Sequence, residues 1–448
     1  SKSGGQAMRG YGLAIGMAIS VLTATVDSRA REWTDNTGAF RIEADLVGVA
    51  GSTVRLKKAD GQVIEVPLDR LSEADQQHLR SVRKSDAKSE RVARGSMAER
   101  IERELQQPAA AEFIETPLQA VTEYLSEMAE VPVRLDRRAL DDVGIGSDVP
   151  IDVSLKAIPL AVVLEGILEP MQLTWVVRDE VVLITTPEEA ESHLSPRVYG
   201  LRKPINPDQL LGDITRNIDP SSWSSVGGPG TVQVLPPNLL VVAQSDVVQR
   251  KLAEHYSELL LPIPLAEQFP VPGSAAAAVK AALFQPTQVD FVDTPLKDVI
   301  DFLQKQHRVT IQVDQRALED VGIGTDVPVT ESLKGIQLRS ALTFLCRPLD
   351  LTWLATKAGI QITTPEAAES RPELVAYRVN DLVPPQGADA LIRVVTSTVA
   401  PASWDNVGGL GSLRLGVRGT LDVRQSFGVQ MEISRLLEDI RRGRQSRR

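Results

Sequence analysis

The sequence has few of the residue types on which catalytic and ligand-stacking sites commonly depend. Among its 448 residues there is one cysteine, Cys346, and aromatic residues make up only 4%. A lone cysteine forms no disulfide within the chain, so the cysteine count says nothing for or against export. So few aromatic residues argue against a surface on which sugars or single-stranded nucleic acid would stack.

Basic charge is also in short supply. The formal net charge is -10, and the acidic residues are dispersed along the chain. Because such a chain repels phosphate backbones, we expect no nucleic-acid partner. What the chain does have is length and apolar content: 42% apolar residues, enough for the cores of about three domains of ordinary size.

No catalytic or metal-binding constellation is apparent in the sequence. His78, His193, His255 and His307 lie in four separate segments without the spacing of metal ligands. Neither a P-loop nor a G-x-G-x-x-G motif is present. We therefore expect no enzymatic activity, no cofactor and no metal.

Long hydrophobic runs are missing as well, with one informative short run near the start. Arg9 precedes an apolar stretch from Gly12 to Ala24, and Ser28-Arg29-Ala30 follows it. A basic, then apolar, then small-residue order is typical of a secretory signal peptide, and the run is too short to span a bilayer. We expect a leader over residues 1–30, a mature chain without a membrane span, and a periplasmic or secreted location. A leader retained as an inner-membrane anchor is the alternative.

Residues 31–80 alternate β-rich runs with turn residues, which predicts a small β-barrel. Ser72 and Asp75 are spaced as a helix cap just after the last strand. Ten residues of the segment form a recognisable pattern: Trp33, Asp35, Gly38, Phe40, Ala44, Leu56, Gly61, Pro67, Leu71 and Ser72. With this pattern the segment resembles the SLA homology domain, an SH3-like family that binds short peptides. That resemblance implies peptide binding, for which Trp33, Asp35, Lys57 and Lys58 are the candidates; the alternative is a core tryptophan and a solvated face of lysines.

The strongest pattern in the sequence is an internal repeat. A stretch beginning at Glu112 recurs at Asp290 in constant register, with close to half of about 81 positions identical. In each copy a Thr-Pro pair predicts a helix start in which threonine caps and proline is the first helical residue. A strand, a leucine-rich second helix and a closing hairpin follow in both copies.

Each copy has an F-x-x-T-P-L entry, at Phe113 and Phe291, then the leucine helix and an L-T-W…I-T-T hairpin. With these features the unit resembles the N-terminal short domain of secretins and TonB-dependent receptors. The resemblance implies a small periplasmic α+β module that contacts proteins. After each unit come a helix, a tryptophan (Trp223, Trp404), a glycine turn, a strand and a last helix, which together resemble the ring-building modules of secretins more loosely. No secretin barrel segment follows, so we expect no pore function.

Comparing the two copies also helps to decide whether the remaining candidate residues are functional or structural. Cys346 matches Leu168 on an apolar helix face, which predicts a core residue rather than a nucleophile. His307 matches Ala129, and an active site is seldom needed twice. Trp223 and Trp404 are expected to pack on their own glycine turns, and the Asp-Val-Gly-Ile-Gly segments are expected to be turns rather than calcium or phosphate loops.

Together these patterns predict an α+β multidomain chain: a small SH3-like β-barrel, then four small α+β modules in series, arranged as two tandem repeats. We expect a protein-binding scaffold of the cell envelope with protein or peptide partners. The alternative is an accessory component of a secretion or TonB-type uptake machine that docks on a separate barrel, and oligomerisation is left open. The expected segments are a signal peptide (1–30), the barrel (31–80), a charged linker and helix (81–106), short domain 1 (107–192), ring-building-like module 1 (193–262), a Pro/Ala linker and helix (263–284), short domain 2 (285–370), ring-building-like module 2 (371–442) and a basic tail (443–448).

Overall fold

The computed structural model describes most of the chain and divides it into two compact units. Unit 1 is Ser1–Arg94 and unit 2 is Gly95–Arg448. The described residues are 31–34, 36, 41–50, 53–58, 63–67, 70–72, 75, 97–203, 205–382, 388–417 and 419–445. The expected leader therefore lies outside the described residues, as does the end of the basic tail. Across the described part the fold is mixed α and β, with several small sheets.

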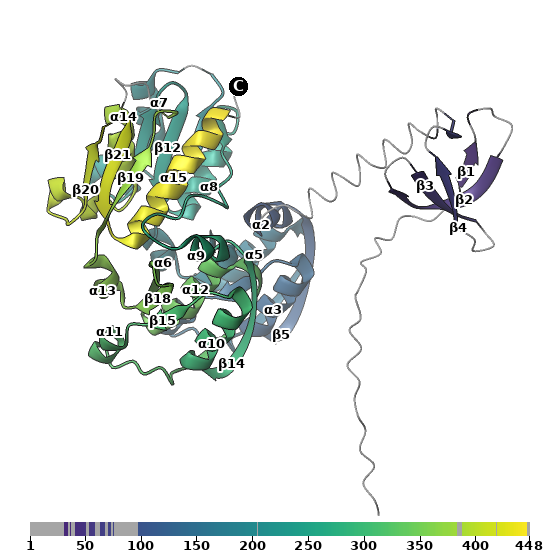
Figure 1. Ribbon diagram of the computed structural model, residues 1–448, viewed down its shortest axis with the longest axis horizontal. Coiled ribbons are helices and arrows are strands. Elements are labelled where there is room, and N and C mark those ends of the chain that lie inside the picture. Colours follow the sequence, from purple (N-terminus) through teal and green to yellow (C-terminus); the bar gives the residue numbers. More distant parts are fainter. Residues whose placement is uncertain are drawn as a thin grey trace, which may run out of the picture. The chain divides into compact units, whose positions relative to one another are not determined.

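Unit 1 contains one antiparallel sheet with strand order β1-β2-β3-β4 (Figure 1). Alternate residues of the strands face a small core in which Trp33, Ala44, Val54, Leu56 and Leu71 are buried. The Trp33 indole N–H donates to the carbonyl of Ala44, 2.9 Å away, which fixes the ring inside the sheet. The strands are β1 (Arg31–Thr34), β2 (Arg41–Ala50), β3 (Thr53–Lys58) and β4 (Val63–Pro67).

The closed barrel expected for unit 1 is wrong for its described residues. Strands β1 and β4 form the two edges of the sheet and no ladder joins them. Instead, the chain after β4 returns to the end of β1 through two backbone bonds: Asn36 N–H to the Arg70 carbonyl (2.8 Å) and Ser72 N–H to the Thr34 carbonyl (2.9 Å). The Asp75 carboxylate accepts from the Ser72 hydroxyl at 2.8 Å, so a cap replaces a closing strand pair.

In unit 2 the first parts of the two related stretches have the same order of helices and strands. We call residues 107–192 and 285–370 short modules 1 and 2, and residues 193–262 and 371–442 terminal modules 1 and 2. Short module 1 is preceded by α2 (Met97–Leu105) and contains β5 (Pro108–Pro117), α3 (Leu118–Ala129), β6 (Val133–Leu135), α4 (Arg137–Asp142), β7 (Pro150–Pro159), α5 (Leu160–Leu168), β8 (Thr174–Arg178), β9 (Val181–Thr185) and α6 (Pro187–Ser192). Short module 2 follows α9 (Ala277–Ala282) with β14 (Pro286–Pro295), α10 (Leu296–His307), β15 (Ile311–Val313), α11 (Gln315–Asp320), β16 (Pro328–Gln337), α12 (Leu338–Cys346), β17 (Thr352–Ala355), β18 (Ile360–Thr363) and α13 (Pro365–Glu369).

The terminal modules each pack two helices on a small antiparallel sheet. In terminal module 1 the sheet order is β11-β12-β10-β13, and in terminal module 2 it is β19-β21-β20. Module 1 contains β10 (Ser195–Leu201), α7 (Pro207–Asn217), β11 (Thr231–Leu235), β12 (Leu239–Gln244), α8 (Asp246–His255) and β13 (Leu260–Pro262). Module 2 contains β19 (Glu373–Arg378), α14 (Ala388–Thr398), β20 (Ser412–Leu415), β21 (Thr420–Gln425) and the long α15 (Phe427–Gln445).

The helix starts at the Thr-Pro pairs differ from the expectation. Pro117 still pairs with Pro150 in the strand ladder and has an extended ψ of 139°, so α3 begins only at Leu118. Thr116 does not cap the helix; its hydroxyl donates to the Ile114 carbonyl at 3.1 Å. The strand therefore continues through the proline, and the helix begins one residue later than predicted.

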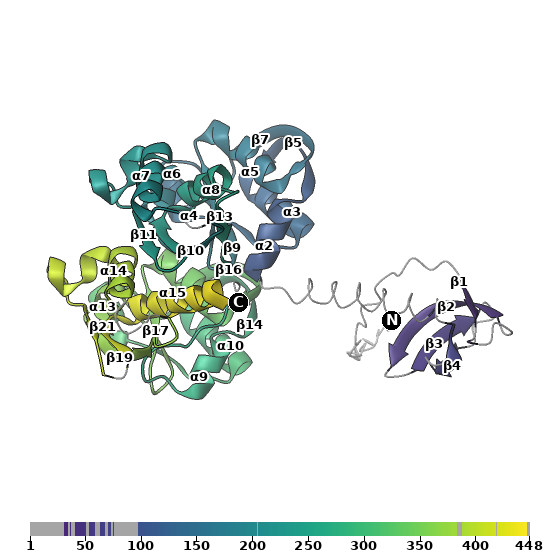
Figure 2. The same cartoon turned by 90° about the horizontal axis from the view of Figure 1, so that it is seen from above.

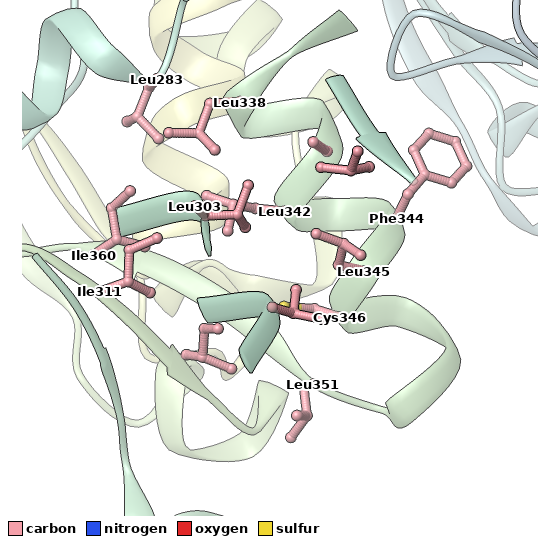
Figure 3. Packing of buried hydrophobic residues seen from close by; sticks show 14 of the residues in the cluster. Leu283, Leu303, Ile311, Leu338, Leu342, Phe344, Leu345, Cys346, Leu351 and Ile360 are labelled. Atoms are coloured by element: carbon pink, nitrogen blue, oxygen red, sulfur yellow. The ribbon is translucent and has the colours of Figure 1, made fainter. Parts of the chain in front are cut away.

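The four modules are not strung out in series; like modules lie side by side. Figure 1 shows the two short modules together at one end of unit 2 and the two terminal modules together at the other, and Figure 2, seen from above, shows copy 1 beside copy 2. The core of short module 2, with Leu342, Cys346 and Ile360 at its centre (Figure 3), continues into Val181 and Leu183 of short module 1. Apolar residues of the two copies thus form one continuous core.

The two terminal modules also pack against each other. One face of the β12 sheet packs on its own helices, and the other, through Leu239 and Val241, packs on α14 and α15 of copy 2. Both faces of β12 are therefore covered, and all six of its residues are buried. Helix α15 lies between the two sheets, joining the copies along its length (Figure 2).

Candidate functional site

Three of the four residues predicted for peptide binding are described, and these three do not lie on one face of the unit 1 sheet. Trp33 is in the core, and Asp35 lies outside the described residues. Successive residues of a strand point to opposite faces, so Lys57 and Lys58 are separated. Lys58 shares the face of buried Val54 and Leu56 and is half-buried, whereas Lys57 is exposed on the opposite, solvent-facing side. Of the three described candidates, Lys57 is the one placed to meet a ligand.

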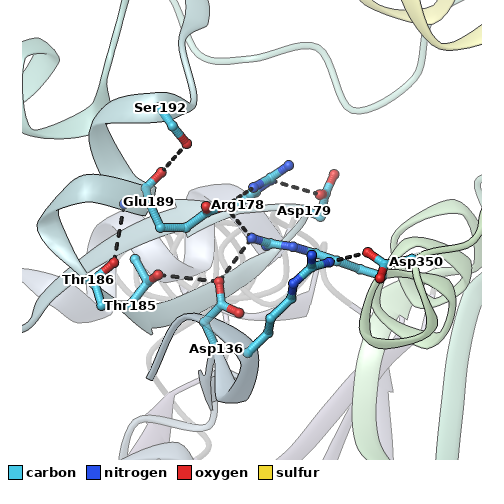
Figure 4. A network of polar contacts seen from close by, with 10 residues as sticks. Asp136, Arg178, Asp179, Thr185, Thr186, Glu189, Ser192 and Asp350 are labelled. Atoms are coloured by element: carbon cyan, nitrogen blue, oxygen red, sulfur yellow. Dashed lines mark hydrogen bonds and ion pairs between the residues drawn. The ribbon is translucent and has the colours of Figure 1, made fainter. Parts of the chain in front are cut away.

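A second polar site lies in unit 2, where the two copies meet. It surrounds a cavity of about 330 Å³ lined by β8, β10, α12 and α15, elements of all four modules. The Arg347 guanidinium from copy 2 reaches the carboxylates of Asp136 (2.9 Å) and Glu189 (2.5 Å) in copy 1. Figure 4 shows these acids with Arg178, which lies 3.8 Å from Glu189. We call this set the junction.

A buried ion pair completes the junction on its other side. Glu180, in the hairpin turn between β8 and β9, lies 3.7 Å from the guanidinium of Arg339 in copy 2. Its carboxylate also accepts the backbone N–H of Gln337 at 2.6 Å. Burial raises the pKa of Glu180, and the charge of Arg339 opposes that rise. Asp179 and Glu180 both have positive φ (48° and 67°), so the turn is held in a costly backbone shape that points the carboxylate at copy 2.

The junction consists of ion pairs that hold the two copies together. Its arginines face carboxylates, and no nucleophile is paired with a base among the residues that line the cavity. Within the described residues, no group of three or more histidine, cysteine or acidic side chains is placed to hold a metal ion. Sequence reasoning missed these residues, although one signal was present: the contacting positions differ in charge between the copies. Arg347 matches Glu169, Arg339 matches Ala161, and Glu180 matches Ala358.

The other residues singled out from the sequence lie where packing was expected. Cys346 is buried in the core of short module 2, where burial raises the pKa of its thiol to about 12. His307 is buried at the end of α10, and burial lowers its pKa. Trp223 and Trp404 are buried, and their indole N–H groups donate to the carbonyls of Ile218 (2.6 Å) and Val399 (2.9 Å).

Residues 24–87 match one known family. That family is SLA1 homology domain 1, SHD1. The match confirms the resemblance for this segment. Among curated proteins, the segment is 44% identical over 48 residues to the actin cytoskeleton-regulatory complex protein SLA1 of Mycosarcoma maydis, and 42% identical over 48 residues to sla1 of Schizosaccharomyces pombe. These matches cover 11% of this chain but only 4% and 3% of the relatives, so the likeness concerns this domain alone.

Solved structures add little to this. The GspC–GspD complex of the type II secretion system from enterotoxigenic Escherichia coli covers 34% of this chain and 97% of its own, at 16% identity and a TM-score of 0.14. A structure titled XcpQN012 covers 55% of this chain and 98% of its own, at 15% identity and a TM-score of 0.14. At these scores neither likeness supports a conclusion about this chain. None of the helices in the described residues is long and apolar enough to cross a membrane.

Proposed function

We propose that the chain is an exported, non-enzymatic scaffold that binds a protein partner through its SHD1 segment. The observation that carries this proposal is the family match over residues 24–87. The solvent-facing side of β3, with Lys57, is the surface we assign to the ligand, because an ammonium group on an exposed strand can meet an acidic residue of an extended peptide. The expected leader supports export.

In this proposal unit 2 is a rigid body that presents surfaces and has no catalytic role. We further propose that its two copies are tandem modules of the short-domain and ring-building types. The matched order of helices and strands in the two short modules supports this, as does the unbroken register in which Trp175 of copy 1 matches Trp353 of copy 2.

The alternative is an accessory component of a secretion or TonB-type uptake machine that docks on a separate barrel, and a ring of several chains would favour it. A ring built by repeating the contact between copies would need apolar faces at both ends of the pair. At the joined faces Val241 meets α14, where Val394 is buried; the matching residues at the free ends are Asp422 and Asp213. Polar ends of this kind close a short array of repeats.

Affinity capture from an envelope extract tests the proposal, with the full chain compared with its Lys57→Glu variant. We expect a defined set of proteins to be captured by the native chain and lost from Lys57→Glu, because the charge reversal repels an acidic ligand. Arg41→Glu, which changes an exposed charge on β2, is the matched control and should retain the set. Capture that does not change with Lys57→Glu would contradict the assignment of this surface.

Light scattering of the native chain tests the alternative. We expect the mass of a single chain; a large closed ring would favour the secretion-machine role. Determination of the N-terminus of the mature protein tests export, for which a start near Arg31 is expected.

A further inference from the structure

One face of the terminal module 2 sheet consists of residues that the strand register brings together. Residues directly opposite each other in antiparallel strands point to the same side of the sheet, and so does every second residue of a strand. Leu374 of β19 lies opposite Arg424 of β21, and Arg414 of β20 lies opposite Asp422 of β21. We call this surface the arginine face; its residues are Leu374, Ala376 and Arg378 on β19, Thr420, Asp422 and Arg424 on β21, and Ser412 and Arg414 on β20.

The arginine face is open to solvent, whereas the residues that alternate with it belong to the core. Tyr377, Leu421 and Val423, on the other side of the same strands, are buried. All residues of the arginine face are exposed or half-buried, and Leu374 is 73% exposed. Because a single exposed leucine is ordinary on a protein surface, the charges around it decide what this face can bind.

The arginine face has an excess of positive charge. Arg378, Arg414 and Arg424 are exposed, and Asp422 is the one carboxylate among the residues of the face. Glu373, the nearest acid along β19, lies on the other side of the strand by the same alternation. Within the described residues no carboxylate forms an ion pair with any of the three guanidinium groups. All three are therefore available to an acidic ligand.

The matched face of copy 1 shows what this side of the sheet can hold. There Leu239 and Val241 are buried beneath α14 and α15 of copy 2. The hydroxyl of Thr231, at the edge of that face, donates to the Ser397 carbonyl on α14 at 2.9 Å. A helix therefore fits on this side of the sheet, with apolar contacts on the central strand and a polar contact at the edge.

The charges disfavour a second copy of the chain as the occupant of the arginine face. Helix α7 of copy 1 matches α14, and it carries Asp213 at the position of Val394. Repeating the contact between the copies would place Asp213 near Asp422, which matches Val241. Because like charges that face each other oppose such a contact, the occupant is a different protein.

We propose that the arginine face binds an acidic amphipathic helix of another protein. An apolar residue of that helix would pack on Leu374 and Ala376, and its aspartate or glutamate residues would face Arg378, Arg414 and Arg424. The planar guanidinium group can donate two parallel hydrogen bonds to one carboxylate, so these pairs also fix the orientation of the helix. This site lies in unit 2 and does not depend on the ligand proposed for the SHD1 segment.

The test is selection from a phage-displayed library of small three-helix proteins in which the exposed face of one helix is randomised, with the full chain as bait. We expect the enriched helices to combine aspartate or glutamate with leucine or another apolar residue. The affinity of a selected protein, measured by fluorescence anisotropy, should fall at least about tenfold in Arg414→Glu/Arg424→Glu and at least about threefold in Leu374→Ser. It should also fall as the salt concentration rises. Circular dichroism of each variant checks that the fold is retained.

The matched control is Arg202→Glu/Arg316→Glu, which changes the net charge by the same amount at exposed arginines outside the arginine face. Its affinity for the selected protein should stay within about twofold of the native value, because distant charges are screened. The proposal is overturned if no helix is enriched, if the enriched helices lack acidic residues, or if the control weakens binding as much as Arg414→Glu/Arg424→Glu does.

Two further outcomes would identify a different occupant and also contradict the proposal. Tighter binding of heparin than of any selected protein, lost in Arg414→Glu/Arg424→Glu and unchanged in Leu374→Ser, would make a polyanion the ligand. Self-association of the native chain that Arg414→Glu/Arg424→Glu abolishes would make a second copy the occupant.

Discussion

Terminal modules 1 and 2 have related sequences but use the outer face of their sheets in opposite ways. In module 1 the outer face of β12 carries Leu239 and Val241 and is buried beneath α14 and α15 of copy 2. In module 2 the matching positions on β21 are Thr420 and Asp422, which are half-buried, and the next residue on that face, Arg424, is exposed. A strand covered on both faces has a continuous apolar run, as in LLVVAQ; one covered on a single face alternates, as in TLDVRQ. The difference shows that the sequence of each copy depends on the elements that cover it as well as on the fold that the two copies share.

The short modules differ in the same way: residues of copy 1 that are buried against copy 2 are matched in copy 2 by smaller or polar residues. Val181 and Leu183 on β9 are buried against copy 2, and their matches in copy 2 are Gly359 and Gln361. Ion pairs follow the same rule: Asp136 is met by Arg347 of the other copy, whereas its match Asp314 is met by Arg371 of its own copy at 2.9 Å. Exchanging residues between matched positions is therefore the direct way to test this asymmetry.

The largest effect is expected when the buried face of copy 1 receives the residue of copy 2. Val241→Asp places an unpaired carboxylate in a fully buried contact and should lower the free energy of unfolding by roughly 4 kcal/mol. The reverse exchange, Asp422→Val, should change it by less than about 1 kcal/mol, because Asp422 is only half-buried and the change removes one hydrogen bond, from the Thr420 hydroxyl, without burying a charge. Urea denaturation followed by circular dichroism measures both, and equal losses would contradict the asymmetry.

The buried ion pair of the junction should come next. Glu180→Ala, which introduces the residue of copy 2, leaves the Arg339 guanidinium buried without its partner and should cost roughly 3 kcal/mol. Arg371→His, which introduces the residue of copy 1, removes a pair whose guanidinium is half-exposed and should cost less than about 1 kcal/mol. If the two variants lose equal amounts of unfolding free energy in denaturant melts, the ion pair between the copies stabilises the fold no more than the pair within copy 2.

A pH-dependent effect is expected from Asp439, buried on α15, whose match in copy 1 is the exposed Glu258. Burial raises the pKa of Asp439 to about 6, although the N–H of Ala266 donates to it at 2.5 Å. The folded state thus holds this proton more tightly than the unfolded state, whose pKa is about 3.9. The stability it contributes is present below about pH 4 and is lost as the pH rises through 6, by about 3 kcal/mol for such a pKa difference.

Urea titrations between pH 4 and 7 check this, with Asp439→Asn as the test variant. The difference in unfolding free energy between the native chain and Asp439→Asn should change across that range. Glu258→Gln should run parallel to the native chain at every pH. A parallel course for Asp439→Asn as well would show that Asp439 titrates normally.

The smallest effect is expected in the cores, where the copies differ least. Leu168→Cys introduces the residue of copy 2 into a buried position and should cost roughly 2 kcal/mol through lost volume. The thiol of Cys346 in the native chain should react with a thiol reagent only on unfolding, since burial keeps it protonated. Fast labelling of the native chain would show that short module 2 opens more easily than its packing indicates.

Much of the fold could be predicted from the sequence because its signals are local. The SHD1 segment was identified by its resemblance to a known family, and the repeat and the buried state of Cys346 followed from comparing matched positions of the two copies. The barrel closure did not follow, because it depends on where the chain after β4 returns to β1. The cap assigned to Thr116 failed because Pro117 stays paired in the strand, a long-range contact that a local pattern cannot reveal.

The candidate sites show the same division. The sequence by itself determined which residues are apolar, which elements recur and that the two copies differ in charge at matched positions. Only the tertiary structure decided that like modules lie side by side, that Lys57 rather than Lys58 is on the solvent-facing side, and that Arg347 contacts Asp136. The physical reason is that short-range patterns fix helices and strands, whereas the partner of a face is chosen by burial between segments about 180 residues apart.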